Sequence, residues 1–356
     1  MRLIIVSNRA PISILQKENN SYEIKESSGG LASGLRTYVE QMREHDPDME
    51  IIWIGWPGET VTEENELSNQ LLIDYKVKCV FLSKDLMENF YEGFCNKTIW
   101  PLFHYFPVYT QYEQEYWEDY KKVNYIYCKT VEEIAEKGDV IWVHDYHLML
   151  LPEMLRNKLP DASIGFFLHI PFPSYEIFRL LPSEWRIAIM KGLFGADLIG
   201  FHTFDYCTYF LRSALRIMGV KDHFGEIVYN NRSIKIDTFP MGIDFLKFHK
   251  ATFSKSVSEE LLKLENNTSG RKIILSIDRQ DYSKGILNRL KGYQTFLEQN
   301  PLWHEKVTMI MIVIPSRIGV ESYKSIKSNI DELSGFINSR FGTLNWLPII
   351  YRYSSV

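Results

Sequence analysis

Four basic residues stand shortly after apolar runs of the sequence, beyond the points where predicted strands end: Arg9, Arg279, Lys284 and Arg317. An arginine in that position can hold a phosphate through two parallel hydrogen bonds, and a lysine supplies a point charge. Arg279 and Lys284 are five residues apart and are followed by Gly285 and a helical pattern. This spacing favours a diphosphate site, although an exposed charged loop has the same composition.

A glycine pair stands just before a predicted helix near the N-terminus. The segment Ser27-Ser28-Gly29-Gly30 precedes the helical pattern Leu31–Glu44. Glycines let the backbone approach a ligand, and the unpaired N–H groups of a helix start favour an anion. A flexible loop with a capping serine would explain the same residues, but the nearby Arg9 favours an anion site.

A carboxylate and a histidine follow two other apolar runs. Asp145 comes after the run Val140–His144, and His169 lies near the end of the run Ile164–Ile170. Ligands of open parallel sheets bind beyond the carboxyl ends of the strands, so both are candidate site residues. Asp145 could instead cap the next helix, and His169 could be structural. The pattern H-D-x-H differs from the helical H-E-x-x-H zinc motif, so we expect no metal.

Together these residues predict a cleft with a cationic pocket at each end. Arg9, the Gly29–Gly30 loop and Arg317 would hold one anion, and Arg279 with Lys284 another. Such a cleft fits sugar-phosphate and nucleotide-sugar substrates. Between the two pockets we expect Asp145, His169 and the aromatic side chains of Trp53, Trp56, Tyr91 and Trp100.

Apolar runs alternate with amphipathic stretches, which implies parallel sheets with right-handed crossovers. A break near Asp237–Asp244 predicts two domains, 1–240 and 241–356. The second has about three strand signals where a doubly wound sheet usually has five or six, so we expect it to be incomplete. The predicted strands are Leu3–Ser7, Ile51–Trp56, Val140–His144, Ile164–Ile170, Leu198–His202, Ile273–Ile277, Met309–Ile314 and Leu347–Tyr351. The predicted helices are Leu31–Glu44, Leu148–Lys158, Ile177–Phe194, Phe204–Met218, Ile286–Glu298 and Tyr323–Phe341.

Composition excludes several classes of protein. The 356 residues include 40 Lys+Arg and 45 Asp+Glu, and 45% are hydrophobic, which is globular and argues against a nucleic-acid partner. No apolar run approaches the ~18 residues of a membrane span, and the first is too short for a signal peptide. Four cysteines without C-x-x-C spacing are interpreted as free thiols in the cytoplasm.

An ordered set of motifs that spans the chain resembles the trehalose-6-phosphate synthase family. The motifs are Ser7-Asn8-Arg9, Ser28-Gly29-Gly30-Leu31, Trp53-Ile54-Gly55-Trp56, Trp142 to Leu148, His169-Ile170-Pro171-Phe172-Pro173, Phe239 to Asp244, Asp278-Arg279, Tyr282-Ser283-Lys284-Gly285 and Pro315-Ser316-Arg317.

The resemblance implies a GT-B fold, in which two Rossmann-like domains with parallel sheets face a cleft. It implies that glucose passes from UDP-glucose to glucose 6-phosphate with retention, without a cofactor or metal. Asp145 and His169 would meet the transferred glucose. Domain 1–240 would bind the acceptor and domain 241–356 the nucleotide sugar. The implied acceptor residues are Arg9, Gly30, Trp56, Tyr91, Trp100 and Arg317, and the implied donor residues are Gly30, Arg279 and Lys284.

The sequence departs from the family at its end, where no segment of the form Asp-Gly-x-Asn-Leu-Val-x-x-Glu is present. We therefore interpret the chain as a fragment with reduced or no activity, or as a shortened relative, and a homo-oligomer stays open. Three alternatives remain: a sister glycosyltransferase with another phosphorylated acceptor such as glycerol 3-phosphate, a non-catalytic sugar-phosphate-binding regulator, and a nicotinamide-linked dehydrogenase. The dehydrogenase is disfavoured because no G-x-G-x-x-G follows a strand.

Overall fold

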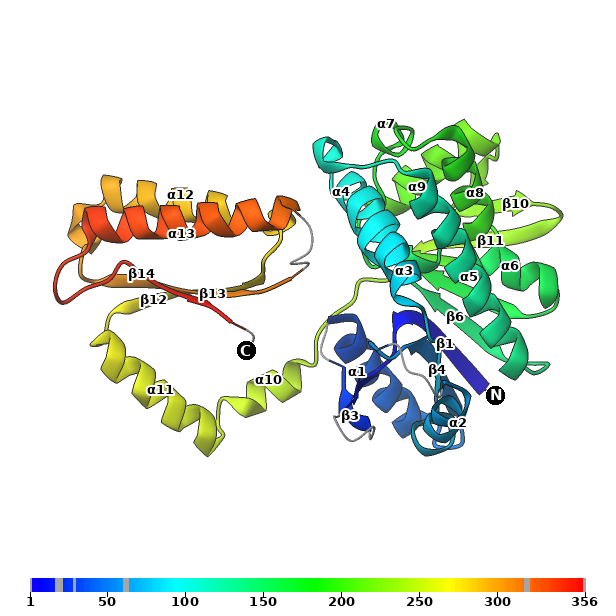
Figure 1. Cartoon of the computed structure of the whole chain (residues 1–356), viewed down its shortest axis with the longest axis horizontal. Helices are drawn as coiled ribbons and strands as arrows, with labels where there is room; N and C mark the ends of the chain where they lie inside the picture. Colours follow the sequence, from blue (N-terminus) through cyan, green and yellow to red (C-terminus); the bar gives the residue numbers. More distant parts are fainter. Residues whose placement is uncertain (1, 17–21, 28–29, 60–63, 317–320, 355–356) are drawn as a thin grey trace. The chain divides into compact units, whose positions relative to one another are not determined.

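The computed structural model describes residues 2–16, 22–27, 30–59, 64–316 and 321–354. The chain divides into two compact units, Met1–Ile243 and Asp244–Val356 (Figure 1). Each unit has its own parallel sheet and its own helices.

The sheet of the first unit runs in the order β5-β4-β1-β6-β7-β8-β11-β10-β9. Neighbours from β5 to β11 pair in parallel, and β10 and β9 add an antiparallel edge. The order reverses between β1 and β6, because the chain first adds β4 and β5 on one side of β1 and later returns to the other. The strands are β1 (Arg2–Arg9), β4 (Glu50–Trp56), β5 (Val77–Cys79), β6 (Val140–His144), β7 (Ser163–Phe167), β8 (Leu198–Phe201), β9 (Asp222–His223), β10 (Glu226–Tyr229) and β11 (Arg232–Thr238).

Strand β1 shows why continuous apolar runs form the centre of this sheet. Leu3 and Ile5 pack into a core with residues of helices α1 and α2. The alternate residues Ile4 and Val6 are fully buried as well, as expected for a strand covered on both faces. The described helices of the unit are α1 (Gly30–His45), α2 (Glu64–Tyr75), α3 (Lys84–Met87), α4 (Trp100–Phe103), α5 (Gln114–Ile134), α6 (Leu151–Lys158), α7 (Tyr175–Phe178), α8 (Ser183–Leu193) and α9 (Phe204–Met218). A π-helix, η1 (Glu88–Ile99), and the 3₁₀ turns η2 (Pro107–Tyr109) and η3 (Tyr146–Leu148) complete them.

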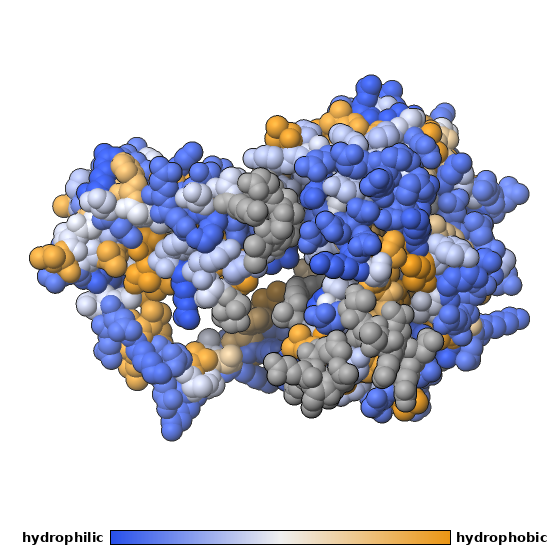
Figure 2. All heavy atoms as spheres, viewed as in Figure 1, coloured by the Kyte–Doolittle hydropathy of each residue, from blue (hydrophilic) through white to orange (hydrophobic). Residues whose placement is uncertain are grey.

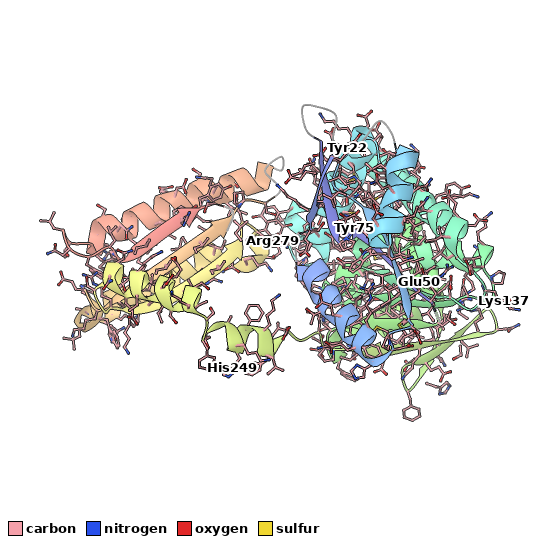
Figure 3. The ribbon with its side chains drawn as sticks, turned by 90° about the horizontal axis from the view of Figure 1, so that it is seen from below. Tyr22, Glu50, Tyr75, Lys137, His249 and Arg279 are labelled. Carbon is pink, nitrogen blue, oxygen red and sulfur yellow. The ribbon has the colours of Figure 1, made fainter. Side chains whose placement is uncertain are left out.

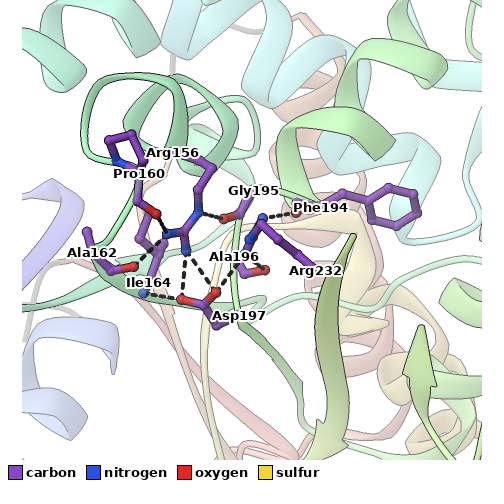
Figure 4. Close-up of polar contacts among 9 residues, drawn as sticks. All are labelled: Arg156, Pro160, Ala162, Ile164, Phe194, Gly195, Ala196, Asp197 and Arg232. Carbon is purple, nitrogen blue, oxygen red and sulfur yellow. Dashed lines mark hydrogen bonds and ion pairs between the residues drawn. The ribbon is translucent and has the colours of Figure 1, made fainter. Parts of the chain in front are cut away.

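A cluster of charged groups holds the amino ends of β7, β8 and β11 together (Figure 4). Asp197, just before β8, accepts hydrogen bonds from Arg156 of α6 at 2.7 Å and from Arg232 of β11 at 2.6 Å. Its carboxylate also accepts from the backbone N–H of Ile164 in β7 at 2.8 Å. The two guanidinium groups donate to carbonyl oxygens of the loops beside them as well. The cluster therefore stabilises the end of the sheet opposite to the strand ends that carry the candidate site residues.

The second unit is a three-stranded parallel sheet in the order β12-β13-β14. Helices α12 and α13 lie side by side on one face and share a buried core with β13 (Figure 1). On β12 and β14, Leu275, Ile277 and Ile350 are exposed. Figure 2 shows apolar atoms gathered between this sheet and α11. The elements are β12 (Lys272–Arg279), β13 (Val307–Ile314), β14 (Ile349–Tyr353), α10 (Phe245–Ala251), α11 (Lys255–Thr268), α12 (Ile286–Gln299), α13 (Glu321–Phe341), η4 (Tyr282–Lys284) and η5 (Pro301–Trp303).

The predicted strands and helices are found, with three differences. The expected helix Ile177–Phe194 is two helices, α7 and α8, because Pro182 separates them. The expected strand Ile164–Ile170 ends at Phe167, and the expected helix from Leu148 starts at Leu151 after a 3₁₀ turn. The prediction did not include the hairpin β2 (Ile12–Gln16) with β3 (Tyr22–Glu26), the strands β5 and β9 to β11, the helices α2 to α5 or the π-helix η1.

Candidate active site

Arg9 lies at the carboxyl end of β1, next to the point where the strand order reverses. Its guanidinium lies over the indole of Trp56, 4.7 Å from the ring centroid, and its Nη2 donates to Ser13 Oγ at 3.1 Å. Gly58 leaves room for it, since a Cβ there would lie 2.7 Å from Nη1. Burial lowers the pKa of Arg9, although the group stays charged at neutral pH. No carboxylate of the described residues forms an ion pair with this partly desolvated cation.

Two serines connect Arg9 to the hairpin β2–β3 and to the segment before α1. Ser13 Oγ accepts from Arg9 and also forms a hydrogen bond with Ser27 Oγ, 2.9 Å away. Gly30 is the first residue of α1. Ser28 and Gly29 lie outside the described residues, and so does Arg317.

The expected aromatic residues occupy different surroundings. Tyr91 of η1 is half-buried and stacks on His147, with the ring planes 10° apart. Trp100, at the start of α4, is buried against His104. We expected Trp53 to be a site residue, and that expectation is wrong. Its indole lies in the core and donates to Ser7 Oγ at 2.7 Å. The side chain that accompanies Arg9 is Trp56, three residues further on.

Asp145 has a backbone that side-chain-bearing residues seldom adopt, with φ 74° and ψ 169°. Its Oδ1 accepts a hydrogen bond from the backbone N–H of His169 at 3.1 Å, and its Oδ2 lies 3.8 Å from His147 Nδ1. Its side chain does not cap the helical turn that follows, so the capping alternative is wrong. Burial raises the pKa of Asp145 to about 7. The strained backbone and the buried carboxyl group are features that are concentrated at functional sites.

His169 follows the end of β7 and belongs to a row of histidines at three neighbouring strand ends. Its Nε2 lies 3.0 Å from Nδ1 of His144, the last residue of β6. His202, just after β8, faces it edge-on with ring centroids 5.6 Å apart. Burial and the nearby His202 lower the pKa of His169 to about 3. All three rings have lowered pKa values, so they are neutral at neutral pH.

Sequence reasoning did not assign Ser13, His144 or His202 to the site, although His144 belongs to the H-D-x-H pattern that it considered. The two histidines had a visible signal, because each closes an apolar run predicted as a strand, and His169 lies one residue before the end of its run. Ser13 had none, because its role depends on the hairpin β2–β3 reaching Arg9.

The second unit places Arg279 and Lys284 around the start of α12. Arg279 is the last residue of β12 (Figure 3), and Lys284 lies in η4. Both side chains are exposed, and neither has a polar partner among the described residues. Arg289 donates to Asp278 and Ser276. Asp281 Oδ1 accepts from the Ser283 N–H at 2.9 Å. These hydrogen bonds order the loop between Arg279 and Lys284. Gly285 directly precedes α12 as its N-cap and has φ 62°. Arg279 and Lys284, two cations without polar partners among the described residues, lie beside the N-terminus of a 14-residue helix and form a candidate diphosphate site.

The described residues also bear on two other classes of site. None of their His, Cys, Asp and Glu side chains form a group of three or more arranged to hold a metal ion. None of their helices combines the length and apolar character needed to cross a bilayer.

Comparison with known proteins gives consistent matches over the whole chain. The model of Glycosyltransferase family 20 matches residues 1–356. A bifunctional trehalose-6-phosphate synthase/phosphatase of Thermoproteus tenax is 43% identical over 356 residues, 99% of this chain and 48% of the relative. This chain therefore spans about half the length of that relative.

Two solved structures that match in fold contain bound ligands. A trehalose-6-phosphate protein from E. coli bound with UDP-2-fluoro glucose has a TM-score of 0.85 at 28% identity, covering 100% of this chain and 74% of that one. An alpha,alpha-trehalose-phosphate synthase (UDP-forming) from Burkholderia xenovorans in complex with glucose-6-phosphate has a TM-score of 0.82 at 30% identity, covering 100% and 75%. These matches confirm the predicted GT-B fold class.

Proposed function

This chain belongs to glycosyltransferase family 20, and from that premise we propose that it transfers glucose from UDP-glucose to glucose 6-phosphate with retention of configuration. The products would be trehalose 6-phosphate and UDP. The names of the relatives support the reaction, and the two ligands named in the matched structures represent the two substrate classes.

The observation that carries the proposal is the state of Arg9. A guanidinium that is half-buried, stacked on Trp56 and in no ion pair with a carboxylate of the described residues is a cation prepared for an external anion, although Glu59 interacts with it electrostatically at longer range. Its place beside the reversal of strand order is where an open parallel sheet binds its ligand. We assign the phosphate of glucose 6-phosphate to Arg9, with Gly30, Trp56, Tyr91, Trp100 and Arg317 as the other acceptor residues. The first unit would be the acceptor domain.

The second unit would be the donor domain. Cleavage of the glucosyl bond moves negative charge onto the departing UDP, and Arg279 and Lys284 would stabilise it. Removing one well-placed donor of this kind typically costs about 3–4 kcal/mol of transition-state stabilisation. Gly30 would approach the donor from the first unit.

Asp145 and His169 would hold the transferred glucose. The Asp145 carboxyl group, with its pKa raised to about 7, can accept from one sugar hydroxyl while Oδ1 remains bonded to the His169 backbone. A neutral His169 with a pKa of about 3 is a poor base, so it would orient the sugar by hydrogen bonding. We assign no protein nucleophile, and the chemistry as proposed needs no cofactor or metal.

The experiment supplies UDP-glucose with glucose 6-phosphate, glycerol 3-phosphate or glucose, and identifies the products by mass spectrometry. The proposal expects UDP and trehalose 6-phosphate with the first acceptor only. A product with glycerol 3-phosphate instead would favour the sister transferase. Tight binding of glucose 6-phosphate in calorimetry, with no UDP released by the chain or by a longer form of it, would favour a regulatory binding protein.

A further inference from the structure

His144 is a buried histidine for which the proposed reaction has no use. It closes β6 and is 0% exposed, and its ring packs against Trp142, with centroids 4.3 Å apart. Its one polar contact among the described residues joins its Nδ1 to Nε2 of His169 at 3.0 Å. Its other nitrogen, Nε2, is buried and has no hydrogen-bond partner among those residues.

The contact between the two rings needs one proton. Burial lowers the pKa of both histidines, so each ring is neutral and carries a single N–H. Either His144 Nδ1–H donates to His169 Nε2, or His169 Nε2–H donates to His144 Nδ1. The two arrangements differ in what they leave at the buried Nε2 of His144.

In the second arrangement His144 Nε2 would carry a buried N–H without an acceptor. In the first arrangement the same atom is a bare acceptor. A buried backbone N–H without a partner is rarer in proteins than an under-satisfied backbone carbonyl, and we extend this asymmetry to the imidazole nitrogens. The surroundings of His144 therefore favour His144 as the donor.

From this geometry we propose that His144 is a positioning residue that fixes His169 as the Nδ1–H tautomer. His169 Nδ1 has no partner among the described residues, yet it is not one of the fully buried unpaired atoms. It is thus the ring nitrogen that a ligand can reach, and the tautomer makes it a hydrogen-bond donor.

Neighbouring groups hold the rest of the His169 geometry. Its backbone N–H is bonded to Asp145, and its ring packs against Phe167 with centroids 4.6 Å apart. The inference rests on the proposed function and deepens it. His169 Nδ1–H would donate to a hydroxyl oxygen of the transferred glucose, and His144 would keep the proton on that nitrogen.

The primary test is NMR of the 356-residue chain with ¹⁵N-labelled histidine, and it needs no activity. Long-range ¹H–¹⁵N correlation identifies the protonated nitrogen of each ring, and the His169→Gln variant assigns the signal. We expect His169 to be protonated on Nδ1, with a scalar coupling across the N–H···N bond to His144 Nδ1. Protonation of His169 on Nε2, or no coupling, would overturn the proposal.

Variants test whether His144 is the cause. His144→Phe keeps an aromatic ring without a donor, so the bond that fixes the tautomer is lost and the Nε2–H form of His169, which free histidine favours, should become populated. His144→Asn places an amide N–H near the position of Nδ1 and should keep His169 in the Nδ1–H form. An unchanged His169 tautomer in a folded His144→Phe protein would refute the positioning role. If that variant does not fold, the wild-type coupling and the His144→Asn spectrum decide.

Kinetics separate this proposal from the proposed function. In protein that makes trehalose 6-phosphate, His144→Phe should lower kcat roughly tenfold, with KM for glucose 6-phosphate unchanged and His144→Asn restoring most of the rate. An unaltered kcat beside the changed tautomer would contradict a role for the tautomer in transfer. If the wild type makes no product, the proposed function fails, while the spectra still test the tautomer.

Discussion

The Arg9 guanidinium lies over the Trp56 ring at 4.7 Å and is hydrogen-bonded at its edge by Ser13 Oγ at 3.1 Å. Stacking on Trp56 fixes the plane of the guanidinium, and the hydrogen bond to Ser13 fixes its rotation within that plane. Gly58 leaves the space that the guanidinium occupies. A guanidinium held in this way loses little conformational freedom when it binds a phosphate.

Replacing Ser13 with alanine should weaken binding of glucose 6-phosphate, because Arg9 loses the hydrogen bond that fixes its rotation. We expect a loss of about 1 kcal/mol, or about fivefold in Kd, measured by calorimetry. Ser13→Thr retains the hydroxyl and should bind as the wild type does. Equal losses in both variants would mean that packing of the hairpin matters rather than the hydroxyl.

Replacing Lys284 with alanine should lower the affinity for UDP, since a cation beside the start of α12 is removed. Glucose 6-phosphate binding should not change. Lys291→Ala is the matched control, because this lysine is also exposed but lies within α12. If the UDP titrations of the two variants are identical, Lys284 is not part of the diphosphate site.

The raised pKa of Asp145 predicts a pH dependence of stability. Its folded pKa of about 7 lies above the unfolded value of about 3.9, so the folded state binds the proton more tightly. This group therefore favours folding most below pH 4, and the contribution is lost as the pH rises through 7.

Asp145→Asn should remove that loss. The free energy of unfolding of the variant minus that of the wild type should therefore increase with pH, by up to about 4 kcal/mol between pH 4 and pH 8. The depressed pKa of His169 acts in the opposite direction in both proteins, so the difference between them largely cancels it. Urea unfolding across this range measures the difference. A constant difference would show that the Asp145 carboxyl group is ionised in the folded protein throughout.

Asp197 should matter for stability and not for ligand binding. Asp197→Ala leaves Arg156 and Arg232 without their shared carboxylate and Ile164 N–H without its acceptor. Because the Asp197 side chain is 43% exposed, we expect a loss of only about 2 kcal/mol in the free energy of unfolding. The exposed Asp161→Ala is the control. A comparable loss in both variants would contradict the role of the cluster.

Strand ends could be predicted from the sequence because continuous apolar runs identify buried parallel strands. Arg9 and Asp145 were found in this way. Helix α5 was missed although Trp117, Tyr120 and Tyr127 form an aromatic stripe on one face, because charged residues separate them in the sequence. The contact of the Asp145 carboxylate with the His169 N–H depends on the pairing of β6 with β7, which residue spacing does not reveal. The difference between Trp53 and Trp56 was equally invisible, since both belong to the same apolar run.

The most direct test of the account is calorimetric titration of glucose 6-phosphate and glucose into the wild type, Arg9→Ala and the control Arg43→Ala, an exposed arginine of α1. Arg9→Ala should weaken binding of glucose 6-phosphate at least tenfold more than binding of glucose, and Arg43→Ala should change neither. Equal losses for both sugars in Arg9→Ala, or none, would contradict the assignment of Arg9 to the acceptor phosphate.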